Sequence, residues 1–514
     1  GIRDCIPVSA FLLNRSSDLF GYLFHLAALI GVVFSLHIKD RMQDVAALAY
    51  AGSAVGAVFA GDLLTLFVFW ELLAVTSVFL VLARRSKHSL STGMRYLVMQ
   101  VGSGVLLLAG AIWYASAGNG LSFGFIGLDA PGGWLIFIAF GIKAGFPLLH
   151  GWLTDAYPEA TPTGTVFLSA FTTKVAIYAL ARGFPGTDLL VLIGTLMTCF
   201  PIFFAVIEND LRRVLAYSMI NQLGFMVVGI GIGTQLALNG AVAHAFTDVI
   251  FKGLLMMSMG AVLHVTGEMR GSELGGLYKK MPKTAILCMV GAASISAFPL
   301  FSGFVSKSMV VAAAIQEGHT VVWLALLFAS AGVFHHAGIK IPFFAFFAHD
   351  SRYVETAHEP PVNMLVAMTL GAVLCVGIGS FPGLLYGLLP YDTGYWPFDV
   401  THVLAQLQLL AFSALAFTWL KLAGIYPPEL KSVHLDVDWL YRRWVPQGIR
   451  TLLAEMAPID RILRDQGKAL VDGTLDLLAR HHGSYGVLAR SWPTGSMVIW
   501  VAVMLGLSLA LYYT

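Results

Sequence analysis

The sequence predicts an all-α polytopic membrane protein with about fourteen transmembrane helices. Hydrophobic residues make up 57% of the 514 residues and charged ones only 12%, and the mean hydropathy is +0.77. Apolar stretches of about 20 residues, long enough to cross a bilayer, also recur along the chain. Soluble domains do not have this composition. The net charge of +2 argues against nucleic-acid binding and leaves lipid and other membrane subunits as the expected partners.

The expected spans are bounded by charged residues or by Gly and Pro. Each is long enough for one helical crossing. In chain order they cover residues 18–38, 44–60, 62–83, 91–116, 133–150, 163–183, 186–207, 212–232, 236–264, 283–312, 320–348, 363–384, 402–424 and 495–513.

The basic residues of the connecting loops support this order of spans. Cytoplasmic loops of membrane proteins carry an excess of Lys and Arg. Between Lys39 and Arg352, thirteen such residues lie at alternate connections on one side, and only Arg182 lies on the other. This places residues 1–17 outside and predicts a multi-pass protein of the inner (plasma) membrane.

The chain becomes polar and helix-prone after Lys421, up to about residue 482. We expect an amphipathic helix that lies along the cytoplasmic face of the membrane; a solvated linker is the alternative. The apolar residues that fall roughly on one face of it are Ile459, Ile462, Leu463, Leu470, Leu475 and Leu478.

A six-residue motif occurs twice: residues 146–151 read FPLLHG, and residues 298–303, 152 positions later, read FPLFSG. Each Pro lies inside an apolar segment, where it breaks or kinks a helix. An odd number of expected spans separates the copies, so they run antiparallel, as interrupted helices do at a transporter's ion path. Chance similarity of six residues is the alternative.

These features divide the chain into six parts. Two of these parts are inverted repeats, each with one broken helix, and we expect them to form the first and the second half-channel. The parts are an N-terminal segment with the first span (1–43), the first inverted repeat (44–183), the second inverted repeat (184–348), additional spans (349–424), the amphipathic lateral segment (425–490) and a C-terminal anchor span (491–514).

Charged residues inside the expected spans are the main functional signal. At mid-bilayer each costs at least about 2.5–3.5 kcal/mol and therefore needs a partner, water or a function. Glu71 lies near the middle of an apolar span, Lys143 precedes the first Pro break, and Lys174 is central in the next span. A Glu–Lys pair in a membrane can exchange protons as its separation changes. For Lys174, a structural lysine bound to backbone carbonyls at a helix break is the alternative.

His244, Asp248 and Lys252 are spaced four residues apart and therefore share one helix face. Successive members are about 6 Å apart along the helix, within reach of proton transfer through single waters. A metal site is the weaker interpretation, because lysine is a poor ligand and only two others are present.

Lys307 follows the second Pro break, and His335, His336 and Lys340 lie in the next span. We expect Lys307 to be functional. The two histidines point about 100° apart on a helix, so at most one is expected to face a proton path.

We expect no cofactor, no metal and no catalytic residue. No nucleotide or iron–sulfur motif is present in the sequence, and its cysteines form no CxxC pair. These cysteines are Cys5, Cys199, Cys288 and Cys375.

Four stretches resemble the antiporter-like membrane subunits shared by respiratory complex I, membrane-bound hydrogenases and Mrp-type cation/proton antiporters. They are FWE at residues 69–71, the segment 143–160 with GWLTDA, DLRRVLAYS at 210–218, and SGFVSK at 302–307. The resemblance covers residues 18–385 or so. It implies two inverted five-helix repeats, each with a broken helix, and a hydrated polar axis halfway through the membrane.

The resemblance also implies roles for the charges of the first half-channel. Glu71 matches the family's glutamate and Lys143 its lysine partner. Lys174 resembles the lysine that links the two halves.

In the second half, His244 and Lys252 resemble the central relay, and Lys307 resembles the terminal lysine. Asp248 departs from the pattern, since many relatives have a second histidine there, and its charge state is left open. Two helices that usually precede residue 18 are also missing from the sequence.

By this resemblance, the chain is a proton-translocating subunit of a multisubunit membrane complex, without redox chemistry of its own. Na⁺/H⁺ antiport is left open. Residues 274–277 and 306–308 look most like the D-type subunit of Mrp antiporters. The lateral segment and final span look more like the distal subunit of complex I. Membership of a complex of the NADH–quinone oxidoreductase or hydrogenase type is therefore the first alternative.

Two further alternatives follow from the residues alone. The first is a redox membrane anchor that binds haem or quinone through some of the 15 histidines, and a Soret band of the purified chain would favour it. The second is a structural scaffold whose buried charges only hold helices together.

Overall fold

The computed structural model describes residues 10–427, 429–430, 436–437, 439–483, 486, 489–490 and 493–513. It is all-helical, which confirms the expected class, and β pairing in the described ranges is limited to two isolated bridges. The expected outer segment 1–17 falls largely on residues 1–9, outside the described residues. The chain forms two compact units, Gly1–Asp436 and Val437–Thr514.

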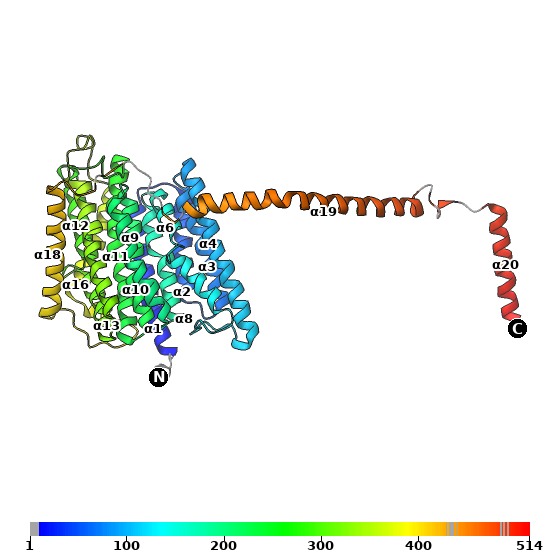
Figure 1. The fold of residues 1–514 in the computed structure, drawn as a ribbon, viewed down its shortest axis with the longest axis horizontal. Coiled ribbons are helices and arrows are strands. Elements are labelled where there is room, and N and C mark those ends of the chain that lie inside the picture. Colours follow the sequence, from blue (N-terminus) through cyan, green and yellow to red (C-terminus); the bar gives the residue numbers. More distant parts are fainter. Residues whose placement is uncertain are drawn as a thin grey trace. The chain divides into compact units, whose positions relative to one another are not determined.

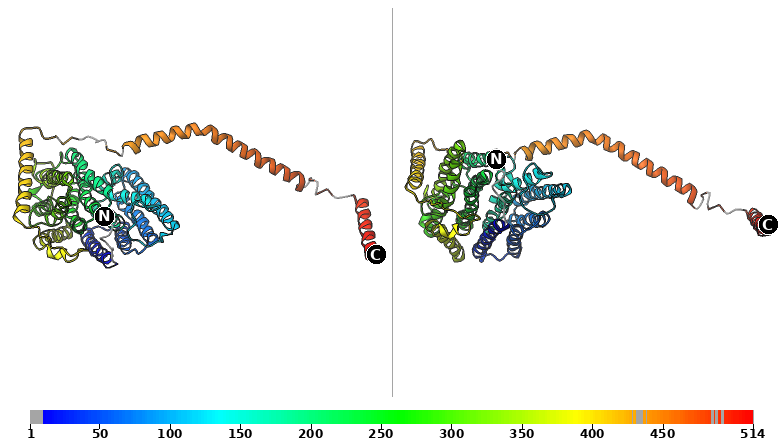
Figure 2. Two further views of the ribbon diagram at one scale, coloured as in Figure 1. Left: turned by 60° about the horizontal axis from the view of Figure 1, so that its bottom comes forward. Right: turned by 90° about the horizontal axis from the view of Figure 1, so that it is seen from below.

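The first unit is a bundle of helices that lie side by side (Figures 1 and 2). Short π-helical turns and one 3₁₀ turn connect or extend some of them. The α-helices are α1 (Ala10–Ser35), α2 (Arg41–Val58), α3 (Leu63–Leu82), α4 (Lys87–Tyr114), α5 (Gly133–Ala144), α6 (Gly151–Glu159), α7 (Gly164–Ala170), α8 (Thr172–Gly183), α9 (Asp188–Ile207), α10 (Leu211–Ile232), α11 (Gln235–Thr266), α12 (Pro282–Ile295), α13 (Ser302–Gln316), α14 (Thr320–Val333), α15 (Lys340–Pro342), α16 (Val362–Ser380), α17 (Gly383–Tyr386) and α18 (Val400–Leu422). The π-helical turns are η2 (Ala115–Asn119), η4 (Phe334–Ile339) and η5 (Phe343–Phe347), and the 3₁₀ turn is η3 (Leu277–Lys279).

Eleven helices of the described chain are long and apolar enough to cross a membrane. Of the other three expected spans, 44–60 matches α2 and two fall on the interrupted pairs α5–α6 and α12–α13; the expected span 133–150 ends before α6 begins. The 18-residue helix α2 begins with polar residues, and each interrupted pair consists of pieces too short to cross alone. The expected count of fourteen therefore depends on counting each pair as one crossing.

Both predicted helix breaks are present, and they have the same backbone. The N–H of Phe146 donates to the carbonyl of Gly141, and that of Phe298 donates to the carbonyl of Ala293, at 3.0 Å in each case. Two residues after each Phe, a leucine adopts the left-handed region, with φ of 70° at Leu148 and 72° at Leu300. Non-glycine residues adopt this conformation only where the surroundings impose it. The repeated motif therefore encodes a repeated interruption.

One end of the bundle, called the basic end below, gathers arginines that the loop pattern assigns to one side. The side chains of Arg84 and Arg212 both donate to the carbonyl of Pro158 at 3.0 Å, and Arg270 pairs with Asp210 in a β-bridge. Arg182, assigned to the other side, instead donates to the carbonyl of Ala60, just after α2. Ala60 lies just before α3 and Arg84 just after it, so the two groups of arginines lie at opposite ends of this helix.

The helices α10 and α11 form the centre of the first unit and are buried along most of their length (Figure 1). The helix α11 packs on α10, α12, α13 and α16. Polar side chains on α11 are therefore surrounded by protein rather than by lipid, which makes this helix the natural position for a polar axis.

The second unit contains a short π-helical turn, η6 (Leu440–Trp444), followed by α19 (Val445–His482) and α20 (Thr494–Tyr513). The 38-residue helix α19 is amphipathic, as expected, and it bends gently along its length (Figure 2). Its apolar residues, among them Ile459 and Leu470, are exposed within this unit. Its orientation along the cytoplasmic face stays a prediction.

Candidate functional site

The first part of the site lies between α3 and α5. The Nζ of Lys143, in the last turn of α5, donates to the carbonyl of Trp70 at 2.5 Å and lies 4.6 Å from the centroid of the Trp70 indole. Glu71 follows Trp70 on α3, and its Oε1 is buried with no hydrogen-bond partner among the described residues. Glu71 and Lys143 act on each other electrostatically but are more than 4.0 Å apart, so they do not form a closed ion pair.

Gly104 on α4 makes room for the Glu71 carboxylate. A Cβ at position 104 would overlap the Oε1 of Glu71 directly. The glycine therefore lets the carboxylate lie against the backbone of α4.

Gly104→Ala is expected to displace Glu71 and to reduce proton transfer about tenfold or more, as expected when a positioned acid–base group is moved. Gly102→Ala is the matched control on the same helix, because a Cβ there meets no atom within 4 Å. The measurement is proton flux in vesicles that contain each variant. Equal fluxes in the two variants would show that the position of Glu71 is unimportant.

The centre of the site is an ion pair between Lys174 of α8 and Asp248 of α11. The Lys174 Nζ is 2.7 Å from the Asp248 Oδ2, and both side chains have 0% exposure. Lys174 also donates to the carbonyl of Ser169, at 3.1 Å, where α7 gives way to α8. This second contact is the one expected for a structural lysine at a helix break, the alternative stated for Lys174 above. The pair joins α8 to α11.

His244 and Lys252 lie on the same face of α11 as Asp248, as expected. The imidazole of His244 contacts the Ser306 hydroxyl through Nδ1 and the Gln222 side-chain carbonyl through Nε2, each at 3.0 Å. The Lys252 ammonium donates to the Ser218 hydroxyl at 2.8 Å. Neutral polar side chains of α10 and α13 therefore hydrogen-bond to His244 and Lys252 and add no charge to this face of α11.

Lys307 lies on α13, just after the second break. Its Nζ donates to the carbonyl of Ile295, the last residue of α12, at 3.1 Å and lies 4.9 Å from the centroid of the Phe225 ring. Lys143, which precedes the first break, likewise contacts one carbonyl and one aromatic ring, both of Trp70. Each break therefore has a buried lysine close to it that contacts a backbone carbonyl and an aromatic ring.

The last three predicted residues lie at η4 and α15, and His336 among them is close enough to Lys252 of α11 to interact with it electrostatically. His336 is fully buried and neither ring nitrogen has a hydrogen-bond partner in the described part of the chain, whereas His335 is only partly buried against Phe417 and Tyr426. The two histidines therefore differ in burial and in neighbours.

Lys340 binds the end of α9. Its Nζ donates to the carbonyls of Val206 and Glu208 at 2.6 Å and lies 3.0 Å from the Glu429 Oε1. Burial raises the pKa of the Glu429 carboxyl, and Lys340 opposes part of that increase. A cation at the C-terminus of a helix is a common stabilising arrangement.

Several site residues were not predicted from the sequence. Ser218 and Gln222 hydrogen-bond to the row on α11, and Gln100 on α4 is fully buried with no partner for either amide atom among the residues described. A polar amide inside an apolar span was the signal available for Gln100 and Gln222. The serines give no such signal, because they occur freely in transmembrane helices.

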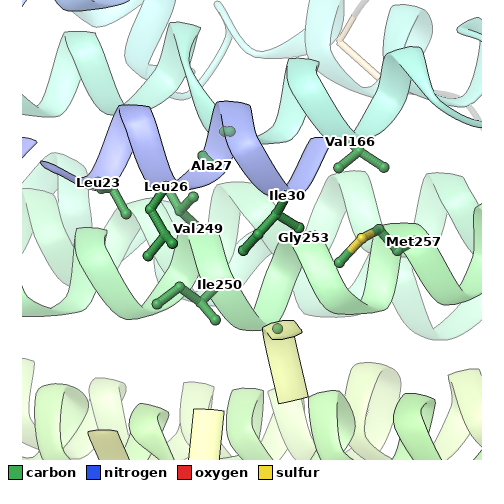
Figure 3. A pocket seen from close by; sticks show the side chains of 11 residues that line it. Leu23, Leu26, Ala27, Ile30, Val166, Val249, Ile250, Gly253 and Met257 are labelled. Atoms are coloured by element: carbon green, nitrogen blue, oxygen red, sulfur yellow. The ribbon is translucent and has the colours of Figure 1, made fainter. Parts of the chain in front are cut away.

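Figure 3 shows an apolar crevice between α1 and α11 whose lining includes Leu23, Ile30, Val249 and Met257. Its free volume of about 20 Å³ is that of a single small sphere, so this crevice does not hold a quinone or a haem. No group of three or more His, Cys, Asp or Glu residues that could hold a metal ion occurs within the described ranges.

The fold and the buried charges define a polytopic membrane protein with an ionisable axis through its interior. Over residues 60–333 the chain matches the family described as "NADH:quinone oxidoreductase/Mrp antiporter, TM". It belongs to this family of antiporter-like membrane subunits, which confirms the resemblance seen in the sequence.

Its relatives include both antiporter and hydrogenase subunits. The chain is 30% identical to the D-type Na(+)/H(+) antiporter subunit of Alkalihalophilus pseudofirmus, over 66% of this chain and 72% of the relative. It is 28% identical to "Hydrogenase-4 component B" of Escherichia coli, over 71% and 62% of the two chains. It is 30% identical to the probable A/B-type K(+)/H(+) antiporter subunit of Rhizobium meliloti, over 88% and 52%. The chain therefore spans less than two thirds of the length of the last two.

Solved structures share the fold. A chain of the Mrp complex from Dietzia sp. superposes with a TM-score of 0.69 and 22% identity, over 76% of this chain and 85% of that one. A chain of the membrane-bound sulfane sulfur reductase, an archaeal respiratory membrane complex, gives 0.67 and 22%, over 96% and 88%. A chain of respiratory complex I from Thermus thermophilus gives 0.64 and 23%, over 73% and 86%.

Proposed function

We propose that this chain is a proton-translocating subunit of a multisubunit membrane complex in the inner (plasma) membrane. The observation that carries the proposal is the fully buried Lys174–Asp248 pair, which links the two repeats at 2.7 Å. A lysine and a carboxylate that share a proton at a buried site can pass it on when their separation changes. The relatives named as antiporter subunits support the same function.

The proposed path follows the buried charges from one half of the chain to the other. Protons move between Glu71 and Lys143 in the first half-channel and through Lys174 and Asp248 at the junction. The second half-channel then consists of His244, Lys252 and Lys307. Successive ionisable residues on α11 are about 6 Å apart along the helix axis, a gap that a single water bridges.

A polar hollow provides an opening for the second half-channel at the end opposite the basic end. It has a volume of about 570 Å³ and is lined by Gln235 and Asn239 of α11, Gln316 of α13, and His402 of α18. Lys307 is nine residues before Gln316 on the same helix, about 13 Å away at 1.5 Å per residue. We place this hollow, and residues 1–17, outside the cell, and the basic end and lateral segment in the cytoplasm.

Lys307→Ala is expected to lower cation-dependent proton movement about tenfold or more in vesicles that contain the whole complex, because the last proton carrier of the second half is lost. Lys280→Ala removes an exposed lysine and serves as the control. Na⁺ is tested in the same vesicles by exchanging it for choline. Unchanged proton movement in the Lys307 variant would refute the assigned role.

A further inference from the structure

The segment after α18 carries two acidic side chains that are buried in the first unit. The side chains of Glu429 and Asp436 have exposures of 6% and 5%. Buried carboxylates require partners, because removing a charge from water is costly. Glu429 has Lys340, whose other contacts fix the end of α9. Asp436 has a different kind of partner, a histidine.

Asp436 binds His150 and Tyr217. Each carboxylate oxygen of Asp436 is 3.3 Å from the His150 Nε2, and the Tyr217 hydroxyl donates to the Oδ2 at 2.7 Å. Tyr217 is six residues into α10, about 9 Å along the helix from the basic end. The carboxylate therefore lies inside the bundle and not at its surface.

His150 occupies a position next to the first helix break. It directly precedes α6, two residues after Leu148 with its left-handed φ of 70°. Its ring packs on Phe200 with the centroids 4.8 Å apart, and its exposure is 1%. The Nδ1, on the other side of the ring from Asp436, is buried without a hydrogen-bond partner among the residues described.

We propose that Asp436 and His150 form a proton-exchange pair that connects the basic end to the first half-channel. Asp436 accepts a proton from the aqueous side and transfers it to the His150 Nε2, and the ring releases its other proton from Nδ1 toward the break and Lys143. Imidazole suits this transfer because it can bind a proton at one nitrogen while it releases one from the other. The inference rests on the proposed function.

An ion pair and an aromatic ring lie beside Tyr217. The Arg213 guanidinium and the Glu208 carboxylate are 3.7 Å apart beside Tyr217, so they compensate each other. Phe204 stacks on the Tyr217 ring, with the centroids 5.3 Å apart. The surroundings of the His150–Asp436 contact therefore include the Arg213–Glu208 ion pair and the rings of Phe200 and Phe204.

The test uses the whole complex in vesicles and compares Asp436→Asn with Asp436→Glu. The Asn variant keeps the size of the side chain and can still accept the Tyr217 hydrogen bond, but it carries no proton. We expect its proton flux to fall about tenfold or more, with normal subunit copurification and an unchanged Tm, and we expect the Glu variant to keep most of the flux. Asp350→Asn, which removes an exposed carboxylate, is the control.

A second comparison uses a double variant. If Asp436 and His150 act in one step, His150→Gln combined with Asp436→Asn loses no more flux than either single variant. Wild-type flux in Asp436→Asn, alongside loss of flux in Glu71→Gln, would overturn the pair but leave the proposed function in place. Equal loss of flux and of Tm in the Asn and Glu variants would also overturn it, by showing a structural contact. Absence of flux in the wild type would refute the proposed function itself.

Discussion

Asp248→Ala is expected to lower the free energy of unfolding by about 3–5 kcal/mol and to abolish proton translocation. The substitution leaves the Lys174 ammonium at 0% exposure without its carboxylate, and an unpaired buried charge has a cost of this size. Thermal unfolding in detergent measures the stability, and vesicle assays measure the flux. An unchanged Tm would show that the pair is not charged in the folded protein.

Replacing both partners separates stability from transport. Lys174→Met combined with Asp248→Leu is expected to recover most of the lost stability, because two apolar side chains of similar volume can replace a buried ion pair at little cost. The flux stays absent, since no group at the junction can carry a proton. Recovery of flux together with stability would favour the structural scaffold over the proton relay.

Glu71→Gln is expected to leave the complex assembled and to reduce proton translocation about a hundredfold, within the range that a positioned acid–base group contributes. Glutamine has nearly the same shape and fits the space opposite Gly104, but it does not titrate. Glu355→Gln, at an exposed position, controls for the loss of a negative charge. The flux and the subunit composition are measured on the same preparation.

Normal flux in Glu71→Gln would remove the first half-channel from the proposed path. Loss of assembly together with flux would instead assign Glu71 a structural role, as the scaffold alternative requires.

The fold was largely predictable because the membrane restricts the choices. Backbone polar groups must be satisfied within the lipid, so long apolar stretches become helices. The repeated FP motif predicted both interruptions, and the structure gives Leu148 and Leu300 nearly equal φ values of 70° and 72°. The number of crossings was harder to predict. The helices α5, α6, α12 and α13 are each too short to cross the membrane alone, so the sequence does not show which pieces form one crossing.

The buried charges were predictable for the same reason. A glutamate or lysine within an apolar span has no cheap structural explanation, and Glu71, Lys174 and Lys307 each stood out in this way. Their partners were not predictable, since pairing depends on which helices meet. Asp248, which departs from the family pattern in the sequence, has Lys174 as its partner at 2.7 Å.

Two kinds of residue escaped prediction. Asp436 and Glu429 lie in a polar connection, where acidic residues are common, and nothing in their local sequence indicates that they return into the bundle. Gly104 is one of 53 glycines, and only the position of the Glu71 carboxylate shows why a side chain is excluded there.

The most direct test of the central claim is vectorial proton movement by the purified wild-type complex in sealed vesicles. A pH-sensitive dye trapped inside reports the internal pH after a cation gradient or a pH step is imposed. Relay of protons through this chain predicts a change in internal pH that is lost when Lys174→Gln breaks the junction between the half-channels. A change of the same rate and size in the Lys174→Gln complex would contradict it.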